Sequence, residues 1–125
     1  MTSIRTILIV DDDSRLRALY GGVLQRAGFV VTDAANGQEA LDCLGESLFD
    51  LVLMDVNMPV MGGLEATRRI RRSARTRGVT VIALTSNAMP EEVDQGLDAG
   101  CDGYIVKPLD PEELLRELEA VLVAE

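Results

Sequence analysis

The chain has 125 residues, a hydrophobic content of 47% and a net charge of −9 at pH 7, which fit one globular domain over residues 1–125. The negative charge argues against nucleic acid as a direct partner, because binding phosphates needs a positive surface, and no apolar stretch is long enough for membrane insertion. Histidine is absent, which excludes His-based catalysis, histidine metal ligands and a role as a phosphohistidine donor.

Short apolar runs alternate five times with helical patterns, which predicts βα units around a parallel sheet. We expect strands at residues 5–10, 29–33, 50–54, 79–84 and 103–106. Their near-continuous Ile, Leu and Val content is typical of strands that are covered on both faces. The pattern therefore predicts an α/β fold with a parallel sheet between two layers of helices.

The first two helices are indicated by apolar spacing and by a capping signal. The first is expected over about 14–27, ending near Gly28. Its apolar face holds Leu16, Leu19, Tyr20, Val23 and Leu24. Gly21-Gly22 in its middle costs about 1 kcal/mol per glycine relative to alanine, and nothing in the sequence explains the pair. The second helix opens with a capping box, with Asn36 as N-cap and Glu39 at N3.

The other three helices differ in how much apolar surface they can bury. The third runs from about Leu64 to Ser73. The fourth, near 89–98, has only Met89, Val93 and Leu97 to bury, so we expect it to be the least firmly anchored. The last opens with Asp110 as N-cap, Pro111 at N1 and Glu113 at N3. It then buries Leu114, Leu118, Val121 and Leu122 at helical spacing.

Polar residues follow four of the five expected strands. They are Asp11, Asp12 and Asp13 after the first strand, Asp55 after the third, Thr85 after the fourth and Lys107, the only lysine, after the last. Because ligands of open parallel sheets bind beyond the carboxyl ends of the strands, we expect these side chains at one edge. Taken singly, each would more simply be a solvated turn, a helix N-cap or a strand-end hydroxyl. Their shared position favours a site.

The chemistry of such a cluster points to a metal. Several carboxylates close together repel one another and need compensation to stay ionised at pH 7. Mg²⁺ suits a few carboxylates combined with a phosphoryl group. One carboxylate can then attack phosphorus, while metal, lysine and hydroxyl neutralise the transferring oxygens. The sequence predicts a Mg²⁺-dependent phosphoryl-transfer site, in which Mn²⁺ can substitute.

Several motifs together carry a family resemblance. They are Ile9-Val10-Asp11-Asp12, Leu53-Met54-Asp55-Val56-Asn57-Met58-Pro59, Gly63, Ala83-Leu84-Thr85-Ser86, Ala99-Gly100, Tyr104 and Lys107-Pro108. Each is weak alone, but in this order and at these spacings they are specific. Essentially the whole chain resembles the receiver domain of two-component response regulators, and chemotaxis-regulator-like single-domain receivers in particular. The resemblance implies a flavodoxin-like (βα)5 fold with five parallel strands in the order 2-1-3-4-5.

The resemblance also implies roles for the site residues. Asp55 would accept a phosphoryl group from a phosphohistidine on a sensor histidine kinase or histidine phosphotransfer protein. Asp12, Asp55 and the backbone carbonyl of Asn57 would hold Mg²⁺, with Asp11 acting through water. Lys107 would pair with Asp55 and then with the phosphoryl oxygens. The domain would not be an enzyme in its own right, although it would assist its own phosphorylation and dephosphorylation.

A switch is implied as well. Thr85 would bind the phosphoryl group and draw its loop inward, and Tyr104 would turn inward behind it. The surface of the fourth helix, fifth strand and fifth helix would then change for a downstream effector protein. Asn57 and Asn87 would tune the lifetime of the acyl phosphate. The protein would act in the cytoplasm, as a monomer or a phosphorylation-dependent dimer.

Two local features bear on this site. The family usually has an aspartate in the Met-Pro-x-Met-Asp-Gly motif where this chain has Gly62. Glycine is a tolerable N-cap for the third helix, so the change affects local rigidity rather than phosphorylation chemistry. The Lys107-Pro108 peptide bond is expected to be cis, which X-Pro bonds permit at modest cost.

The two cysteines and a run of arginines are most simply explained by structural roles. Cys43 and Cys101 lack metal-type spacing and are expected to be reduced core residues. A run of arginines comprises Arg68, Arg69, Arg71, Arg72, Arg75 and Arg77. Because cations favour a helix C-terminus, a solvated face is the first interpretation of this run. A docking patch for an acidic partner is the second.

Three other functions remain as alternatives. A haloacid-dehalogenase-type phosphohydrolase would use Asp11-x-Asp13 with Asp11 as the nucleophile, but its later acidic pair and cap domain are lacking. A flavin binder is disfavoured, because three carboxylates in the first loop would repel a phosphate. A receiver that serves only as a binding module is disfavoured by the intact set of site residues.

The extent of the protein is also open. The chain starts at a methionine and ends just after the last helix, which favours a stand-alone regulator. The stretches 54–70 and 83–90 resemble receivers fused to hybrid histidine kinases. A domain excised from such a kinase or from a larger regulator is therefore the alternative.

Overall fold

Five parallel strands form one sheet in the order β2-β1-β3-β4-β5 in the computed structural model, which describes residues 4–86, 89–107 and 110–124. The strands are β1 (Thr6–Val10), β2 (Val30–Ala34), β3 (Leu51–Asp55), β4 (Thr80–Thr85) and β5 (Gly103–Val106). The helices are α1 (Ser14–Arg26), α2 (Gly37–Glu46), α3 (Gly63–Arg72), α4 (Pro90–Ala99) and α5 (Pro111–Ala124). The predicted fold class and strand order are confirmed.

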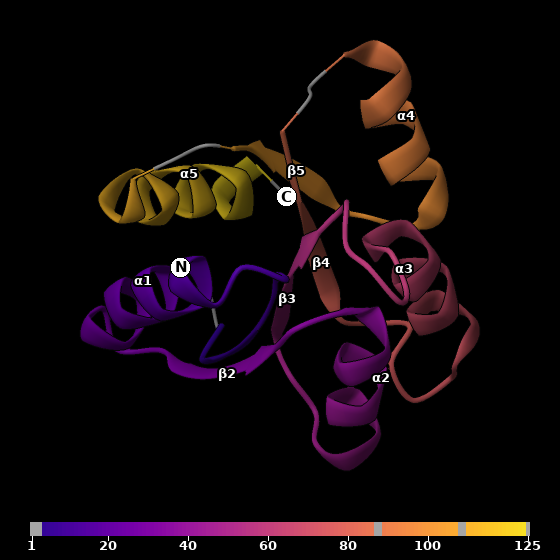
Figure 1. The fold of residues 1–125 in the computed structure, drawn as a ribbon, viewed down its shortest axis with the longest axis horizontal. Coiled ribbons are helices and arrows are strands. Elements are labelled where there is room, and N and C mark those ends of the chain that lie inside the picture. The colour runs from indigo at the N-terminus through magenta and orange to yellow at the C-terminus, as the bar shows by residue number, and fades with distance from the viewer. Residues whose placement is uncertain (1–3, 87–88, 108–109, 125) are drawn as a thin grey trace.

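Helices cover both faces of this sheet, as Figure 1 shows, with α1 and α5 on one side and α2, α3 and α4 on the other. Because side chains alternate along a strand, each strand supplies both layers of the core. Ile7 and Ile9 pack with Tyr20 and Leu24 of α1, whereas Leu8 packs on the α2 side. None of the helices in the described part of the chain is both long and apolar enough to span a membrane.

The prediction that all five strands are covered on both faces is wrong for the two edge strands. β1, β3 and β4 are almost wholly buried, but Val30 of β2 is 64% exposed and Val106 of β5 is 40% exposed. An edge strand has only one neighbour, and here the helices do not extend over its outer part. The apolar content of a short run therefore indicates a strand but does not fix its place in the sheet.

The predicted helix starts are confirmed in detail. The Asn36 side chain accepts a hydrogen bond from the Glu39 backbone N–H at 2.9 Å, and the Glu39 carboxylate accepts one from the Ala35 N–H at 3.0 Å. The Asp110 side chain accepts from the Glu113 N–H at 2.9 Å. Gly62 is the N-cap of α3, and because glycine has no side chain it makes no side-chain hydrogen bond to the first turn of this helix.

Two expected helix faces need correction. Leu19 of α1 is 53% exposed, because α1 turns Tyr20, Val23 and Leu24 toward the core and Leu19 lies at the edge of this stripe. In α4 the buried residues are the small Gly96 and Ala99 rather than the larger side chains, with Met89 54% and Leu97 49% exposed. α4 therefore rests on even less apolar surface than the sequence predicts.

Glycines fix the loop that follows β3. A Cβ atom on Gly63 would lie 2.0 Å from the carbonyl oxygen of Asp55, which is closer than real contacts allow. The N–H of Gly63 also donates to the Val56 carbonyl at 3.0 Å. Glycine therefore lets α3 begin directly against the end of β3. Gly21 lies near Val31 and Ile9 with room for a Cβ, and nothing in the structure explains Gly22.

We expect Gly63→Ala to lower the free energy of unfolding by about 3 kcal/mol, because the new methyl group must displace the backbone of Asp55. Urea denaturation followed by circular dichroism would measure the change. Gly45→Ala is the matched control: this α2 glycine has no described neighbour within 4 Å of an added Cβ, so the change should stabilise by roughly 0.5–1 kcal/mol. Equal effects of the two substitutions would contradict the close approach.

Candidate functional site

The predicted site residues Asp11, Asp55, Thr85 and Lys107 lie at the carboxyl ends of four neighbouring strands. Asp11 directly follows β1, Asp55 ends β3, Thr85 ends β4 and Lys107 directly follows β5. The side chains of Asp11, Asp55 and Thr85 are buried, with residue exposures of 0%, 5% and 7%. Parallel pairing brings these ends to one edge, as the sequence predicted.

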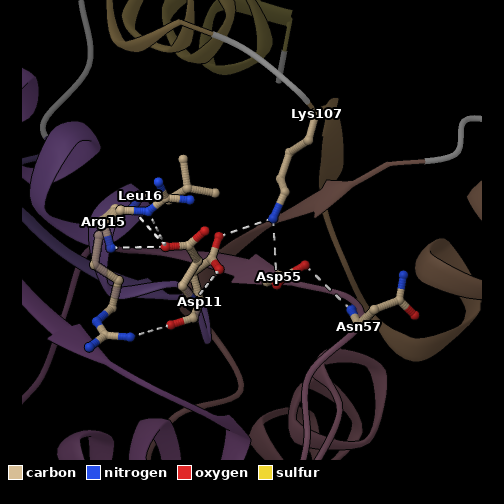
Figure 2. Close-up of polar contacts among 8 residues, drawn as sticks. Asp11, Arg15, Leu16, Asp55, Asn57 and Lys107 are labelled. Carbon is tan, nitrogen blue, oxygen red and sulfur yellow. Dashed lines mark hydrogen bonds and ion pairs between the residues drawn. The ribbon is translucent and has the colours of Figure 1, made fainter.

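Lys107 supplies the positive charge of this cluster. Figure 2 shows its side chain reaching toward Asp11 and Asp55, with Nζ 3.1 Å from Asp11 Oδ2 and 3.6 Å from Asp55 Oδ2. The ammonium group thus contacts both carboxylates and donates its hydrogen bond to Asp11 rather than to Asp55. Burial alone would lower the pKa of Lys107, but the hydrogen bond to Asp11 and the charge of Asp55 outweigh burial and raise it.

Three carboxylates lie close together beside this lysine, which contacts two of them, Asp11 and Asp55. Asp11, Asp12 and Asp55 each offer an oxygen, and these oxygens all lie within 4.8 Å of one another. Burial raises the pKa of Asp55 to about 6; the charge of Lys107 opposes the shift and that of Asp11 adds to it. One lysine therefore does not balance the cluster, and hard oxygen donors at this spacing fit a divalent cation.

The backbone beside Asp55 adds to the site. The Asn57 N–H points back at the carboxylate of Asp55, with N and Oδ1 3.4 Å apart (Figure 2). The loop from Val56 onward is held by β4, since the Val56 N–H donates to the Leu84 carbonyl at 3.0 Å. The phosphoacceptor candidate and the residue two positions later are thus fixed relative to the neighbouring strand.

Asp13, the third aspartate of the triplet, has a different role. Its carboxylate accepts hydrogen bonds from the N–H groups of Arg15 at 2.9 Å and Leu16 at 3.4 Å, so it is the N-cap of α1. The bond from Arg15 is the main cause that lowers its pKa. A phosphohydrolase built on Asp11-x-Asp13 is disfavoured, because Asp13 caps a helix while Asp55 occupies the cluster.

Arg17 belongs to the site although the sequence analysis did not single it out. Its guanidinium donates to the Asp11 carbonyl oxygen at 2.7 Å and to Asp33 Oδ2 of β2 at 2.9 Å, and the side chain is only 17% exposed. Arg17 therefore holds the loop that carries Asp11 and Asp12. The sequence does contain a signal for this role, since Arg17 lies in the first turn of the helix that directly follows the acidic loop.

Thr85 and Tyr104 occupy neighbouring strands near the cluster. The Lys107 N–H donates to the Thr85 carbonyl at 2.6 Å, which ties the ends of β4 and β5 together. Tyr104 is 42% exposed and, with Thr85, lines a cavity of about 20 Å³ beneath α4. Asn87 and the Lys107-Pro108 bond lie outside the described residues.

The two cysteines behave as the sequence predicted. Cys101 is buried, with Sγ 3.9 Å from Thr67 Oγ1, and Cys43 is half-buried against the α2 side of the core. Burial is the main cause that raises the pKa of both thiols, which keeps them protonated and unreactive.

Comparison with known sequences identifies the class of this fold and site. The model of the response regulator receiver domain matches residues 7–119, and the chain belongs to this family. It is 38% identical over 118 residues to the phosphate regulon transcriptional regulatory protein PhoB of Pseudomonas aeruginosa. It is 39% identical over 116 residues to the transcriptional regulatory protein ResD of Bacillus subtilis. These matches cover 94% and 93% of this chain but 52% and 47% of the relatives, so the chain spans about half their length.

Solved structures agree with this assignment. The chemotaxis response regulator CheY4 of Vibrio cholerae superposes with a TM-score of 0.89 at 37% identity, covering 95% of this chain and 99% of that one. The receiver domain of a sensor histidine kinase from Pseudomonas aeruginosa, solved with a magnesium ion in its active site cleft, gives 0.82 at 35% identity and covers 94% and 97%. The chain is thus similar to receivers from both regulators and kinases.

The raised pKa of Asp55 predicts how stability depends on pH in the absence of metal. In the folded state the Asp55 carboxyl has a pKa of about 6, whereas its ordinary pKa is 3.8. Between these values the folded state binds more protons than the unfolded state, so stability falls as pH rises. We expect Asp55→Asn to be more stable than wild type at pH 7.5 by about 1–2 kcal/mol after allowance for solvent screening. The difference should vanish at pH 4.

Urea denaturation in EDTA at the two pH values would measure this effect. Asp50→Asn is the control with the opposite sign, because hydrogen bonds from the backbone of Arg5 and Thr6 lower the pKa of Asp50. That substitution should therefore destabilise the protein at pH 7.5. If Asp55→Asn were less stable than wild type at pH 7.5, the ionised Asp55 carboxylate would not be a cost to the folded protein, and the prediction would be wrong.

Proposed function

We propose that this receiver domain, spanning residues 1–125, works in a phosphorelay in which Asp55 accepts a phosphoryl group from a phosphohistidine. The donor would be a sensor histidine kinase or a histidine phosphotransfer protein. One observation carries the proposal: a buried carboxylate at a strand end lies within 4.8 Å of two others and 3.6 Å from the only lysine. The family assignment supports the same role.

The donor set of this cluster fits Mg²⁺, and Mn²⁺ could substitute. Asp12, Asp55 and the backbone carbonyl of Asn57 would hold the ion, with Asp11 acting through water. When bound, the ion supplies the positive charge that one lysine does not, to the carboxylates and to an incoming phosphoryl group. The magnesium in the cleft of the related kinase receiver supports this proposal.

The chain's own residues then account for the transfer. A carboxylate oxygen of Asp55 attacks phosphorus and forms an acyl phosphate, while the P–N bond to the donor imidazole breaks and its electron pair stays on nitrogen. The imidazole leaves in the neutral form, with a proton that its other ring nitrogen already carries or that the solvent supplies. With a pKa of about 6, Asp55 is mostly ionised at pH 7 and remains nucleophilic. Lys107 moves its hydrogen bond to a phosphoryl oxygen, and the Thr85 hydroxyl donates to another.

Output would come from the surface of α4, β5 and α5. Thr85 moves toward the phosphoryl group, and Tyr104 turns inward behind it as α4 shifts, since the cavity of about 20 Å³ there holds only about one water molecule. The weakly anchored α4 and the exposed side chains of Met89, Leu97 and Val106 make this surface adaptable and readable by a downstream effector protein. Asn57 and Asn87 would tune the lifetime of the acyl phosphate. The protein would act in the cytoplasm, as a monomer or a dimer formed on phosphorylation.

The proposal predicts a single phosphoryl adduct on Asp55. Wild type incubated with acetyl phosphate and Mg²⁺ should gain one adduct by intact-mass spectrometry, and EDTA or Asp55→Asn should abolish it. Asp11→Asn should only weaken the reaction. Turnover of phosphate by Asp55→Asn, with Asp11→Asn inactive, would instead establish the phosphohydrolase alternative. An absence of adduct with acetyl phosphate, phosphoramidate and phosphorylated kinase would leave a binding module.

Lys107 is expected to act in the transfer rather than in holding the metal. Lys107→Ala should slow adduct formation by about 10²-fold, because one positive group is lost from the transferring oxygens. It should also raise the pKa of Asp55 further, since the Lys107 charge now lowers it. Calorimetric Mg²⁺ affinity should not weaken. Arg116→Ala, an exposed change on α5, is the control, and an equal slowing of both variants would contradict the role of Lys107.

A further inference from the structure

The run of arginines from Arg68 to Arg77 is the strongest feature that phosphorylation does not explain. It holds six of the twelve basic residues of a chain whose net charge is −9. One of the six, Arg71, is half-buried and serves the fold. Arg71 donates to the carbonyls of Gly100, Arg77 and Val79 and pairs with Asp102 at 2.8 Å. The first interpretation, a uniformly solvated face, is therefore incomplete.

The remaining five arginines differ in their charge partners. Arg68 and Arg69 share Glu65, at 3.7 Å and 3.0 Å. Within residues 4–86, 89–107 and 110–124, Arg72, Arg75 and Arg77 have no carboxylate at ion-pair distance, and all three are exposed. Arg72 still lies close enough to Glu65 for its charge to help lower the pKa of that carboxyl. The end of α3 and the turn into β4 thus carry a surplus of positive charge on an otherwise acidic protein.

An open hollow of about 290 Å³ adjoins this charge, close to the small end of the range for ligand sites. Its apolar lining comes from Leu44, Leu48, Phe49 and Val79, and Leu48 is 67% exposed. Arg75 stands at its rim, with Nε donating to the Leu44 carbonyl at 3.2 Å. Arg72 and Arg77 do not line the hollow but lie close to Arg75 in the sequence, at the end of α3 and in the turn before β4. We call the hollow, together with these three arginines, the basic groove.

One carboxylate, that of Asp50, also lines the hollow. Its Oδ2 atom is already engaged, because it accepts hydrogen bonds from the N–H groups of Arg5 at 2.9 Å and Thr6 at 3.1 Å. Asp50 therefore serves the start of β1 and does not pair with Arg75. The same hydrogen bonds lower the pKa of Asp50 and keep it ionised, so a docked carboxylate would lie toward the arginines and away from Asp50.

We propose that the basic groove docks a short acidic segment of a partner protein. An apolar side chain of the segment would enter the hollow over Leu48 and Phe49, and its carboxylates would pair with Arg72, Arg75 and Arg77. Guanidinium groups bind carboxylates through paired hydrogen bonds, and a buried apolar anchor within a polar rim is the usual anatomy of a small interface.

Charge and position favour this occupant over others. A nucleic acid or anionic membrane would extend beyond three arginines and meet the surrounding negative surface of a chain with net charge −9. The groove lies at the amino ends of β3 and β4, whereas Asp55 and Thr85 end those strands, roughly 17 Å away for a strand of this length. Docking would leave the phosphoacceptor accessible and does not depend on the proposed phosphorylation.

The test uses a fluorescein-labelled peptide with Leu-Phe at its centre and Glu or Asp at all other positions. Two control peptides replace the acids by Gln and Asn, or Leu-Phe by Ser-Ser. Binding is measured by fluorescence anisotropy and located by amide chemical shifts. We expect shifts in the turns around Leu48 and Gly78, and at least about tenfold weaker binding of each control peptide.

Protein variants make the test specific. The double variant Arg72→Gln/Arg75→Gln should weaken binding about tenfold. Arg26→Gln/Arg116→Gln, which removes the same charge from exposed positions on α1 and α5, should change it less than about twofold. Leu48→Ser should also weaken binding without lowering the melting temperature, because Leu48 is largely exposed.

Several outcomes would overturn the proposal. These are failure of the peptide to bind at millimolar concentration, shifts away from the groove, or equal losses in the two double variants. Arg75-dependent binding of duplex DNA or phosphatidylserine vesicles tighter than that of the peptide would indicate a polyanion site. Arg75-dependent self-association in light scattering would indicate a second copy as the occupant. Asp55→Asn should bind the peptide like wild type, which separates this result from the phosphorelay.

Discussion

The unequal balance between one lysine and three carboxylates is the constraint on which the site depends. Lys107 lies 3.1 Å from Asp11 and 3.6 Å from Asp55, yet the pKa of Asp55 still rises to about 6. Burial is the main cause of this rise and the charge of Asp11 adds to it, so without a cation the ionised Asp55 is unfavourable in the folded protein. In the proposed function, a cation would stabilise the ionised Asp55, and a phosphoryl group would take over the hydrogen bond of Lys107. Metal affinity and phosphoryl transfer are thus linked through the same charges.

The fold holds this cluster rigidly on one side and loosely on the other. Arg17 fixes the loop of Asp11, and the absence of a Cβ on Gly63 lets α3 begin against the carbonyl of Asp55. On the other side, α4 buries mainly Gly96 and Ala99, and the cavity beside Thr85 lies beneath it. A change at Asp55 therefore meets least resistance toward α4 and β5, which is where the proposed output surface lies.

The apolar runs and the residues that follow them predicted the five strands and the gathering of Asp11, Asp12, Asp55 and Lys107 at one edge, whereas the order of the strands came only from the family resemblance. The sequence did not predict that β2 is largely exposed, because the amino-acid composition of a strand does not show how many strands and helices cover it. It treated the aspartate triplet as one group, although Asp13 caps α1. It did not single out Arg17 and gave no separate role to Arg71, because their backbone carbonyl and carboxylate partners lie 6 to 31 residues away and leave no periodic signal.

The measurement that tests the account most directly is the number of protons released when Mg²⁺ binds. Calorimetry at pH 6 in two buffers of different ionisation enthalpy gives this number. Because the pKa of Asp55 is about 6, the account predicts release of about half a proton per Mg²⁺ at pH 6, and almost none at pH 8. Asp55→Asn should remove the release. Binding at pH 6 with no proton release, or release that persists in Asp55→Asn, would contradict the claim that Mg²⁺ binding and the charge of Asp55 are coupled.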